Sequence, residues 1–122
     1  NFVLQAVFEA QPAPAEEMER LLAAARAKRK LSQPVGASAG CIFKNPEEIP
    51  AGRLIDELGL KNACVGDACV SDVHANFIIN RGHARARDIT ILIDMIRKEA
   101  MENRGIDLKS EAQVIGDREP QF

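Results

Sequence analysis

A short stretch from Ser38 to Pro46 concentrates the residue types that could do chemistry. Its first residues, Ser38 to Gly40, are small and let another group approach the backbone, since Gly has no side chain. Cys41 then supplies a thiol, and Lys44 and Asn45 supply a cation and an amide. A proton donor or nucleophile beside an anion-binding cation is typical of a small-molecule site. A short strand in which Cys41 is a small buried hydrophobe explains the same residues, so the pattern alone leaves both interpretations open.

Composition bounds the class of protein. The 122 residues predict one domain, and the net charge of -2 with both signs interspersed gives no footprint for nucleic acid or for an anionic membrane surface. No apolar run approaches the roughly 18 residues of a membrane span. The three cysteines, an odd number, favour a reducing compartment over a disulfide framework. Because Cys64 and Cys69 lack the spacing of a zinc site and no second pair follows, no metal is expected.

The first third of the chain predicts a strand and a helix. Residues 2–9 alternate as in a strand, and because the chain opens on it without Met, the sequence indicates a piece of a longer protein. A helix is expected over residues 15–30. Its apolar stripe follows helical spacing and consists of Met18, Leu21, Leu22 and Ala25.

The rest of the chain predicts short strands alternating irregularly with helices. The expected elements are a strand ending at Pro46, a helix over 51–58 closed by Gly59, two short strands about a turn at Gly66 and Asp67, a strand over 77–79, a helix over 86–104 closed by Gly105, and a last strand over 106–115 that carries Glu111. This order predicts an α+β fold with a single mixed or antiparallel sheet covered by helices.

Several motifs occur together in one order and spacing. They are Ser38–Pro46, Ala51–Asp56, Gly59–Lys61, Val70–Ser71, His74–Asn80 and Ile115–Gly116. With these motifs the chain resembles, over about residues 2–116, the C-terminal domain of the UDP-N-acetylenolpyruvoylglucosamine reductase family, flavoenzymes of peptidoglycan precursor synthesis. The resemblance implies that residues 1–9 end a preceding flavin-binding region, that residues 10–116 form the domain, and that residues 117–122 are a loose tail.

The resemblance also implies a reaction and its cofactors. In this family NADPH reduces FAD, hydride passes to C3 of an enolpyruvyl group, and a protein acid protonates C2 to give UDP-N-acetylmuramate. The flavin is held mainly by N-terminal domains of the same protein, which this chain lacks, and the C-terminal domain contacts the UDP-sugar. The expected protein is therefore a cytoplasmic oxidoreductase, and the fragment alone is expected to be inactive.

Residue roles carry over position by position. Cys41 stands where the family usually has the proton-donating serine, and a thiol, with a pKa of about 8.5, releases a proton more readily than an aliphatic hydroxyl. Glu111 matches a glutamate that assists protonation. Neighbouring positions depart from the common pattern at Lys109, Ser110 and Ala112.

Further positions imply binding roles. Asn45, Lys61 and His74 match substrate-binding positions, with Lys61 at the diphosphate, although His74 replaces a glutamine of a related subtype. Ser38 and Gly40 match positions near the cofactor. From the residues alone, Glu111 fits a solvated strand residue, Lys61 fits a surface lysine after a helix end, and His74 fits a hydrogen-bonded turn residue.

Two other functions fit parts of the sequence. A non-catalytic nucleotide-sugar binding module with the same fold would bind the UDP-sugar without turnover. A thiol redox module would use Cys64 and Cys69, and the absence of a Cys-x-x-Cys motif argues against it.

Overall fold

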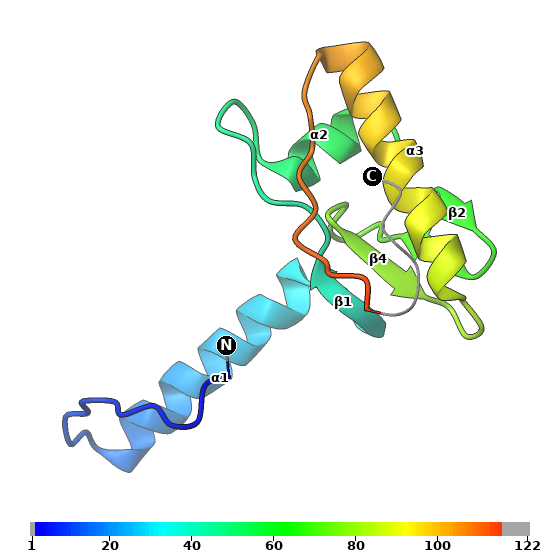
Figure 1. Ribbon diagram of the computed structural model, residues 1–122. Helices are drawn as coiled ribbons and strands as arrows, with labels where there is room; N and C mark the ends of the chain where they lie inside the picture. Colours follow the sequence, from blue (N-terminus) through cyan, green and yellow to red (C-terminus); the bar gives the residue numbers. More distant parts are fainter. Residues whose placement is uncertain (1, 116–122) are drawn as a thin grey trace.

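A four-stranded antiparallel sheet forms the centre of the molecule, as Figure 1 shows. The computed structural model describes residues 2–115. The strands lie in the order β1 (Ala37–Cys41), β4 (Phe77–Asn80), β3 (Ala68–Val70) and β2 (Cys64–Val65). This architecture confirms the predicted α+β class and resolves its sheet as antiparallel.

The long helix α3 (Ala86–Arg104) lies along β2 and β3 and has the predicted bounds. The carboxylate of Asp88 accepts a hydrogen bond from the backbone N–H of Arg85 at its start, and Gly105 ends it in a left-handed conformation with φ of 66°. The buried face of α3 is an apolar stripe at helical spacing: Leu92, Ile93, Ile96 and Ala100.

The short helix α2 (Ala51–Glu57) contacts α3 and closes the hydrophobic core. Gly59, with φ of 72°, follows it as predicted. The core joins α2, α3, β3, β4 and the residues that flank β1. Its largest fully buried members are Phe43, Ile42, Leu54, Ile55, Leu92, Ile96, Leu108 and Val70.

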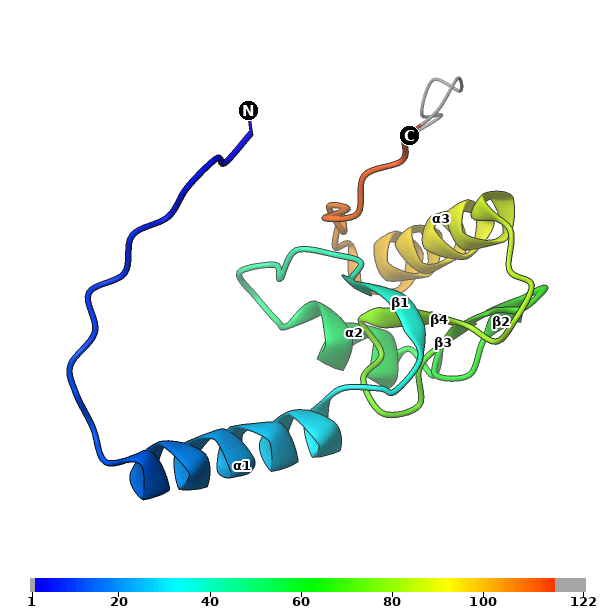
Figure 2. The same ribbon diagram turned by 90° about the horizontal axis from the view of Figure 1, so that it is seen from below.

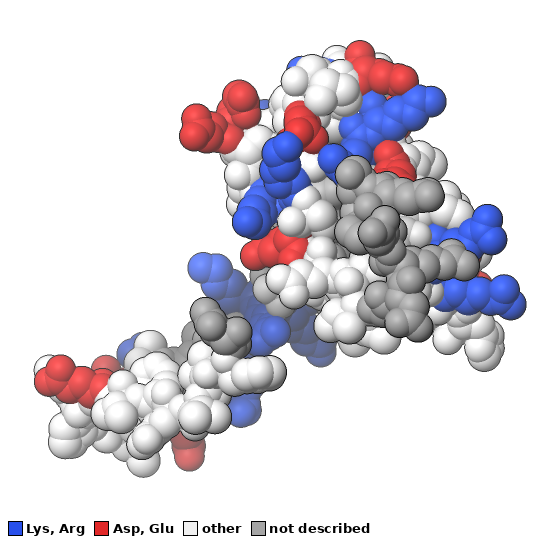
Figure 3. All heavy atoms as spheres, in the orientation of Figure 1, with Lys and Arg blue, Asp and Glu red and all other residues white. Residues whose placement is uncertain are grey.

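The helix α1 (Ala15–Ser32) stands apart from this core, as Figures 1 and 2 show. The helix was predicted, and it does not cover the sheet, because none of its residues is buried. Its apolar stripe is about half exposed at Met18, Leu21 and Leu22. Acidic residues occupy its outer end and basic residues the end that adjoins β1, which Figure 3 shows in red and blue.

Residues 2–14 contain no strand, so the strand predicted over 2–9 is wrong for this chain. A strand needs a neighbour for its backbone hydrogen bonds, and this segment runs away from the sheet without one (Figure 2). Phe2, Leu4 and Phe8 are each more than 85% exposed. No helix in residues 2–115 is long and apolar enough to cross a membrane.

The segment after α3 is extended but is not the predicted strand. Within the described residues it forms an isolated β-bridge, between Ser110 and Phe43, in place of a strand. Backbone bonds from Lys44 N–H to the Lys109 carbonyl and from Glu111 N–H to the Ile42 carbonyl flank this bridge. The predicted loose tail at 117–122 lies outside the described residues.

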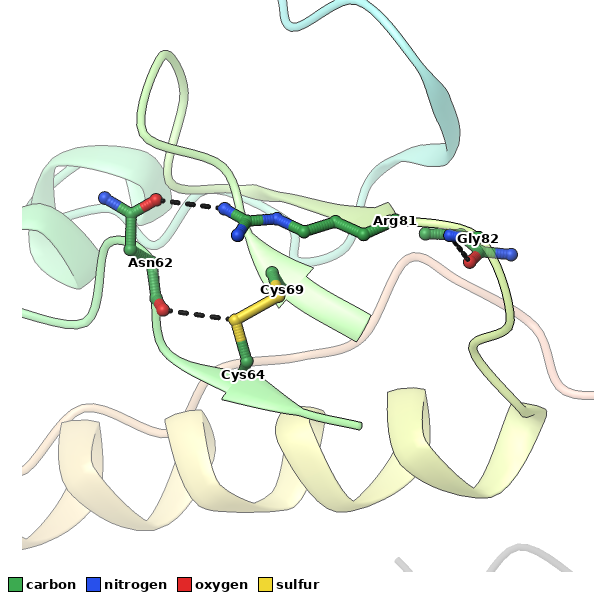
Figure 4. Close-up of a disulfide and its surroundings, with 6 residues drawn as sticks. Asn62, Cys64, Cys69, Arg81 and Gly82 are labelled. Atoms are coloured by element: carbon green, nitrogen blue, oxygen red, sulfur yellow. Dashed lines mark hydrogen bonds between the residues drawn. A yellow bond between two sulfur atoms is a disulfide. The ribbon is translucent and has the colours of Figure 1, made fainter. Parts of the chain in front are cut away.

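Cys64 and Cys69 form a disulfide across the β2–β3 hairpin, shown in Figure 4. The prediction that the cysteines would stay reduced is therefore wrong for this pair, and Cys41 is the free cysteine. The two-residue turn at Gly66 and Asp67 places Cys64 directly opposite Cys69, with their Cα atoms 4.1 Å apart. This separation is slightly shorter than the usual range for disulfides.

The side chain of Asn76 takes the place of a neighbouring strand beside Phe43. Its Oδ1 accepts from the Phe43 N–H at 2.9 Å, and its Nδ2 donates to the Phe43 carbonyl at 2.8 Å. Both residues are buried. The backbone carbonyl of Asn76 also accepts from the Ile42 N–H at 2.9 Å. Residues 42 to 44 are thus held by Asn76 on one edge and by residues 109–111 on the other.

We expect Asn76→Ala to lower the free energy of unfolding by about 2–4 kcal/mol, because each orphaned buried backbone group costs roughly 1–3 kcal/mol. Chemical denaturation measures this loss. Asn103→Ala is the matched control, since the Asn103 amide makes its two hydrogen bonds, both to Glu99, on the exposed face of α3. Equal losses in the two variants would contradict a special role for the Asn76 amide.

Candidate functional site

One cavity of about 340 Å³ gathers most of the predicted site residues. It lies between the end of β1, the start of α2 and the turn before β4. Cys41, Asn45, Lys61 and His74 all line it, although they come from four separate segments of the chain. A volume of this size is at the lower end of small-ligand pockets.

Cys41 reaches this cavity because β1 departs from regular pairing just before it. The register between β1 and β4 shifts between Ser38 and Cys41, and Gly40 lies within the shift with φ of 81°. A bulge of this kind redirects the side chain that follows it. Partial burial and the negative charge of Glu111 raise the pKa of the Cys41 thiol above its ordinary value, whereas a hydrogen bond with Asn76 lowers that pKa in part. The pKa of the Cys41 thiol is raised on balance, which favours its protonated form.

Glu111 lies on the other side of the Cys41 segment. Its backbone N–H donates to the carbonyl of Ile42 at 2.7 Å. Because Ile42 directly follows Cys41 in the chain, this bond holds the Glu111 backbone near the thiol. Its side chain is exposed and does not line the cavity. The structure therefore brings the Glu111 charge close to Cys41 but leaves its carboxylate outside the group of four.

Lys61 projects from the turn that joins α2 to β2. This turn needs two left-handed residues, Gly59 with φ of 72° and Asn62 with φ of 62°. The Lys61 ammonium donates to the Asp56 carboxylate at 2.7 Å, and both side chains line the cavity. The cation is thus positioned at the cavity with a carboxylate beside it.

Asn45 links the chain after β1 to α2. Its Oδ1 accepts from the Ala51 N–H at 3.0 Å, which satisfies one of the free N–H groups at the start of the helix. The oxygen is therefore engaged in the fold, and the amide NH₂ group is the part of Asn45 that can donate to a ligand.

His74 packs against the first turn of α2. A Cβ atom at Gly52 would lie 2.9 Å from its Cε1, so only glycine fits there without a shift of the ring. Nδ1 accepts from the Asn76 N–H at 3.2 Å, and the ring meets Phe77 edge-on at 4.9 Å between centroids. With Nδ1 accepting, the neutral ring carries its proton on Nε2, which leaves a hydrogen-bond donor for the cavity.

The two predicted cofactor positions lie elsewhere on β1. Ser38 lines a second hollow of about 280 Å³, together with Asn80 and apolar residues of β1, β4 and α3. Gly40 lines neither hollow, and a Cβ atom there would meet nothing within 4 Å. The strand surface around Gly40 is therefore open to close approach by another group.

Three polar residues of the cavity were not predicted as site residues: Asn76, Arg53 and Asp56. Asn76 stands in the His74–Asn80 motif, but nothing in the sequence shows that its amide pairs with Phe43. Arg53 and Asp56 lie three residues apart in a helix, a spacing that places both on one face. Within residues 2–115, no three His, Cys, Asp or Glu side chains gather into a group able to hold a metal ion.

Curated relatives share most of this chain. The protein from Syntrophobacter fumaroxidans is 43% identical over 114 residues, which cover 93% of this chain and 33% of the relative. The protein from Geotalea uraniireducens is 45% identical over 117 residues, which cover 95% of this chain and 39% of the relative. Both are UDP-N-acetylenolpyruvoylglucosamine reductases. The chain thus spans between a third and two fifths of their length.

A solved structure and a family model agree with these relatives. The UDP-N-acetylenolpyruvylglucosamine reductase (MurB) of Thermus caldophilus superposes with a TM-score of 0.70 at 45% identity, over 84% of this chain and 36% of that one. The model of the C-terminal domain of UDP-N-acetylenolpyruvoylglucosamine reductase matches residues 30–115. The chain therefore belongs to the UDP-N-acetylenolpyruvoylglucosamine reductase family and carries its C-terminal domain.

Proposed function

We propose that this chain is the substrate-binding part of a reductase that converts the enolpyruvyl ether of UDP-N-acetylglucosamine into UDP-N-acetylmuramate, with Cys41 as the proton donor. The observation that carries the proposal is the shared cavity, in which a thiol, a cation, an amide and an imidazole converge from four segments. Such convergence of polar groups in one hollow is the usual form of a small-molecule site.

In this reaction the part of Cys41 is to give a proton to C2 of the enolpyruvyl group. An acid must hold its proton until the carbon becomes basic, and partial burial beside Glu111 raises the pKa of the thiol in that direction. Water would return a proton to the thiolate after turnover, and the negative charge of Glu111 nearby would favour that return. Lys61 would bind the diphosphate as a point charge, and the Asn45 amide and His74 Nε2 would donate to the sugar nucleotide.

We propose that the flavin meets this chain along β1. The small residues of β1 and the open surface at Gly40 permit a flat group to approach the backbone, and Ser38 offers a hydroxyl beside it. We place those two residues at the edge of FAD, which when reduced by NADPH supplies hydride to C3. The remaining contacts to FAD would come from the part of the protein outside this chain.

We further propose that α1 and residues 2–14 belong with that flavin-binding part. Three observations support this: the family model begins at residue 30, α1 buries none of its side chains, and residues 2–14 lack a neighbouring strand. The domain boundary would then lie near residue 30 rather than near residue 10. The partners of the domain are therefore the rest of its own protein and the UDP-sugar.

We expect Cys41→Ala in the full-length protein to separate the two halves of the reaction. Reduction of the flavin by NADPH stays normal, whereas its reoxidation by the enolpyruvyl substrate slows at least about 100-fold, because general acid catalysis typically contributes that factor or more. Stopped-flow absorbance of the flavin measures each half separately. Cys41→Ser is the matched variant and keeps much of the reoxidation rate, since a hydroxyl can also donate.

Unchanged reoxidation in Cys41→Ala would show that the thiol only packs. A full-length protein that binds the UDP-sugar but never reoxidises its flavin would instead indicate the non-catalytic binding module.

The charge of Glu111 gives a second prediction, which the 122-residue chain can test. Glu111→Gln removes a negative charge beside Cys41, so the pKa of the thiol falls toward its ordinary value while partial burial still holds it raised. Ultraviolet absorbance of the thiolate across pH reports Cys41 alone, because Cys64 and Cys69 form a disulfide. Glu48→Gln, in an exposed loop, is the control. Identical titrations of the two variants would contradict the placement of Glu111.

A further inference from the structure

Arg53 is a second cation of the cavity, and it has no role in the function proposed above. It is the third residue of α2 and lines the same cavity as Lys61. Its side chain is 72% exposed, and its Nε donates to Glu57 Oε1 at 2.8 Å. The side chain is thus held at the rim by one contact and is otherwise free to face a ligand.

Glu57 does not depend on Arg53 for a partner. Its other oxygen, Oε2, accepts from Arg104 Nη2 at 3.0 Å, and this second contact ties α2 to α3. Hydrogen bonds from Arg53 and Arg104 together hold the pKa of the Glu57 carboxyl below its ordinary value. If Arg53 turned away, Glu57 would keep Arg104 as a partner. An exposed pair of the Arg53–Glu57 type adds little to stability, so its loss on ligand binding is a small cost.

The charges that line the cavity show why a second cation matters. Lys61 contacts the Asp56 carboxylate at 2.7 Å, and both side chains face the cavity. Asp56 therefore neutralises much of the charge that Lys61 would offer to an anion. With Arg53 the lining holds two cations against one carboxylate, and without Arg53 it is balanced. The negative charge of a diphosphate is attracted by the lining that includes Arg53, because that lining carries a net positive charge.

We propose that Arg53 is a diphosphate-binding residue of this cavity. On binding it leaves Glu57 to Arg104 and donates two parallel hydrogen bonds to phosphate oxygens, while Lys61 contributes its point charge from the turn after α2. The planar guanidinium suits this bidentate contact, which an ammonium cannot make. This inference rests on the proposed function, because it takes the UDP-sugar as the ligand.

The test compares Arg53→Gln with Arg104→Gln in the full-length protein. Both variants remove a guanidinium that contacts Glu57, but only Arg53 lines the cavity. We expect Arg53→Gln to raise KM for the UDP-sugar roughly tenfold, since a hydrogen bond to a charged group is worth about that factor, with kcat and flavin reduction by NADPH unchanged. Arg104→Gln raises KM far less, because it removes no cation from the cavity. Arg53→Lys restores part of the affinity, as a point charge without the bidentate geometry.

A binding measurement keeps this inference separate from the proposed function. Calorimetry with UDP and with uridine isolates the contribution of the two phosphates. Arg53→Gln should weaken UDP roughly tenfold and leave uridine unchanged, and its UDP affinity should depend less steeply on salt.

If the wild-type protein turns over and Arg53→Gln has an unchanged KM, the role of Arg53 is overturned and the reductase function stands. If the wild-type protein does not turn over, the function fails, and the difference between UDP and uridine still decides the role of Arg53.

Discussion

The pairing of the Asn76 amide with the backbone of Phe43 is the constraint on which the site depends. It satisfies both polar groups of a buried residue where no strand is available to do so. The same contact fixes the chain just after Cys41. It also positions His74, which lies two residues before Asn76. Residues 109–111 occupy the opposite edge, so the exposed thiol of Cys41 has Asn76 and Glu111 as neighbours. A rigid backbone of this kind allows a side chain to be aimed within tight limits.

The two ends of the molecule differ in how completely their apolar side chains are buried. Around the sheet, α2 and α3 bury a continuous core and leave one cavity whose polar groups converge. At the other end α1 exposes its apolar stripe, and residues 2–14 extend without a neighbour (Figure 2). An exposed apolar surface of this extent is typical of an interface. This arrangement supports the proposed division into a substrate-binding domain and a segment that packs against another part of the same protein.

Local patterns predicted local structure well and tertiary contacts poorly. The stripe of α3 and the terminating Gly105 gave its bounds, because both signals lie within the helix itself. The turn at Gly66 was predicted too, and its register already places Cys64 opposite Cys69, so the disulfide could have been predicted from the hairpin. The prediction of a strand around Glu111 was wrong, because the pairing of that segment depends on residues far away in the chain. The Asn76 contact, 33 residues from Phe43 in sequence, leaves no periodic signal at all.

The most direct test of the central claim is the pH dependence of flavin reoxidation by the enolpyruvyl substrate in the full-length protein. If Cys41 is the acid, the rate falls as pH rises through the raised pKa of its thiol, because the thiolate has no proton to give. Cys41→Ser then loses this alkaline decline, since a serine hydroxyl does not titrate in the range. The same decline in Cys41→Ser as in the wild-type protein would contradict the claim and assign the proton to another group.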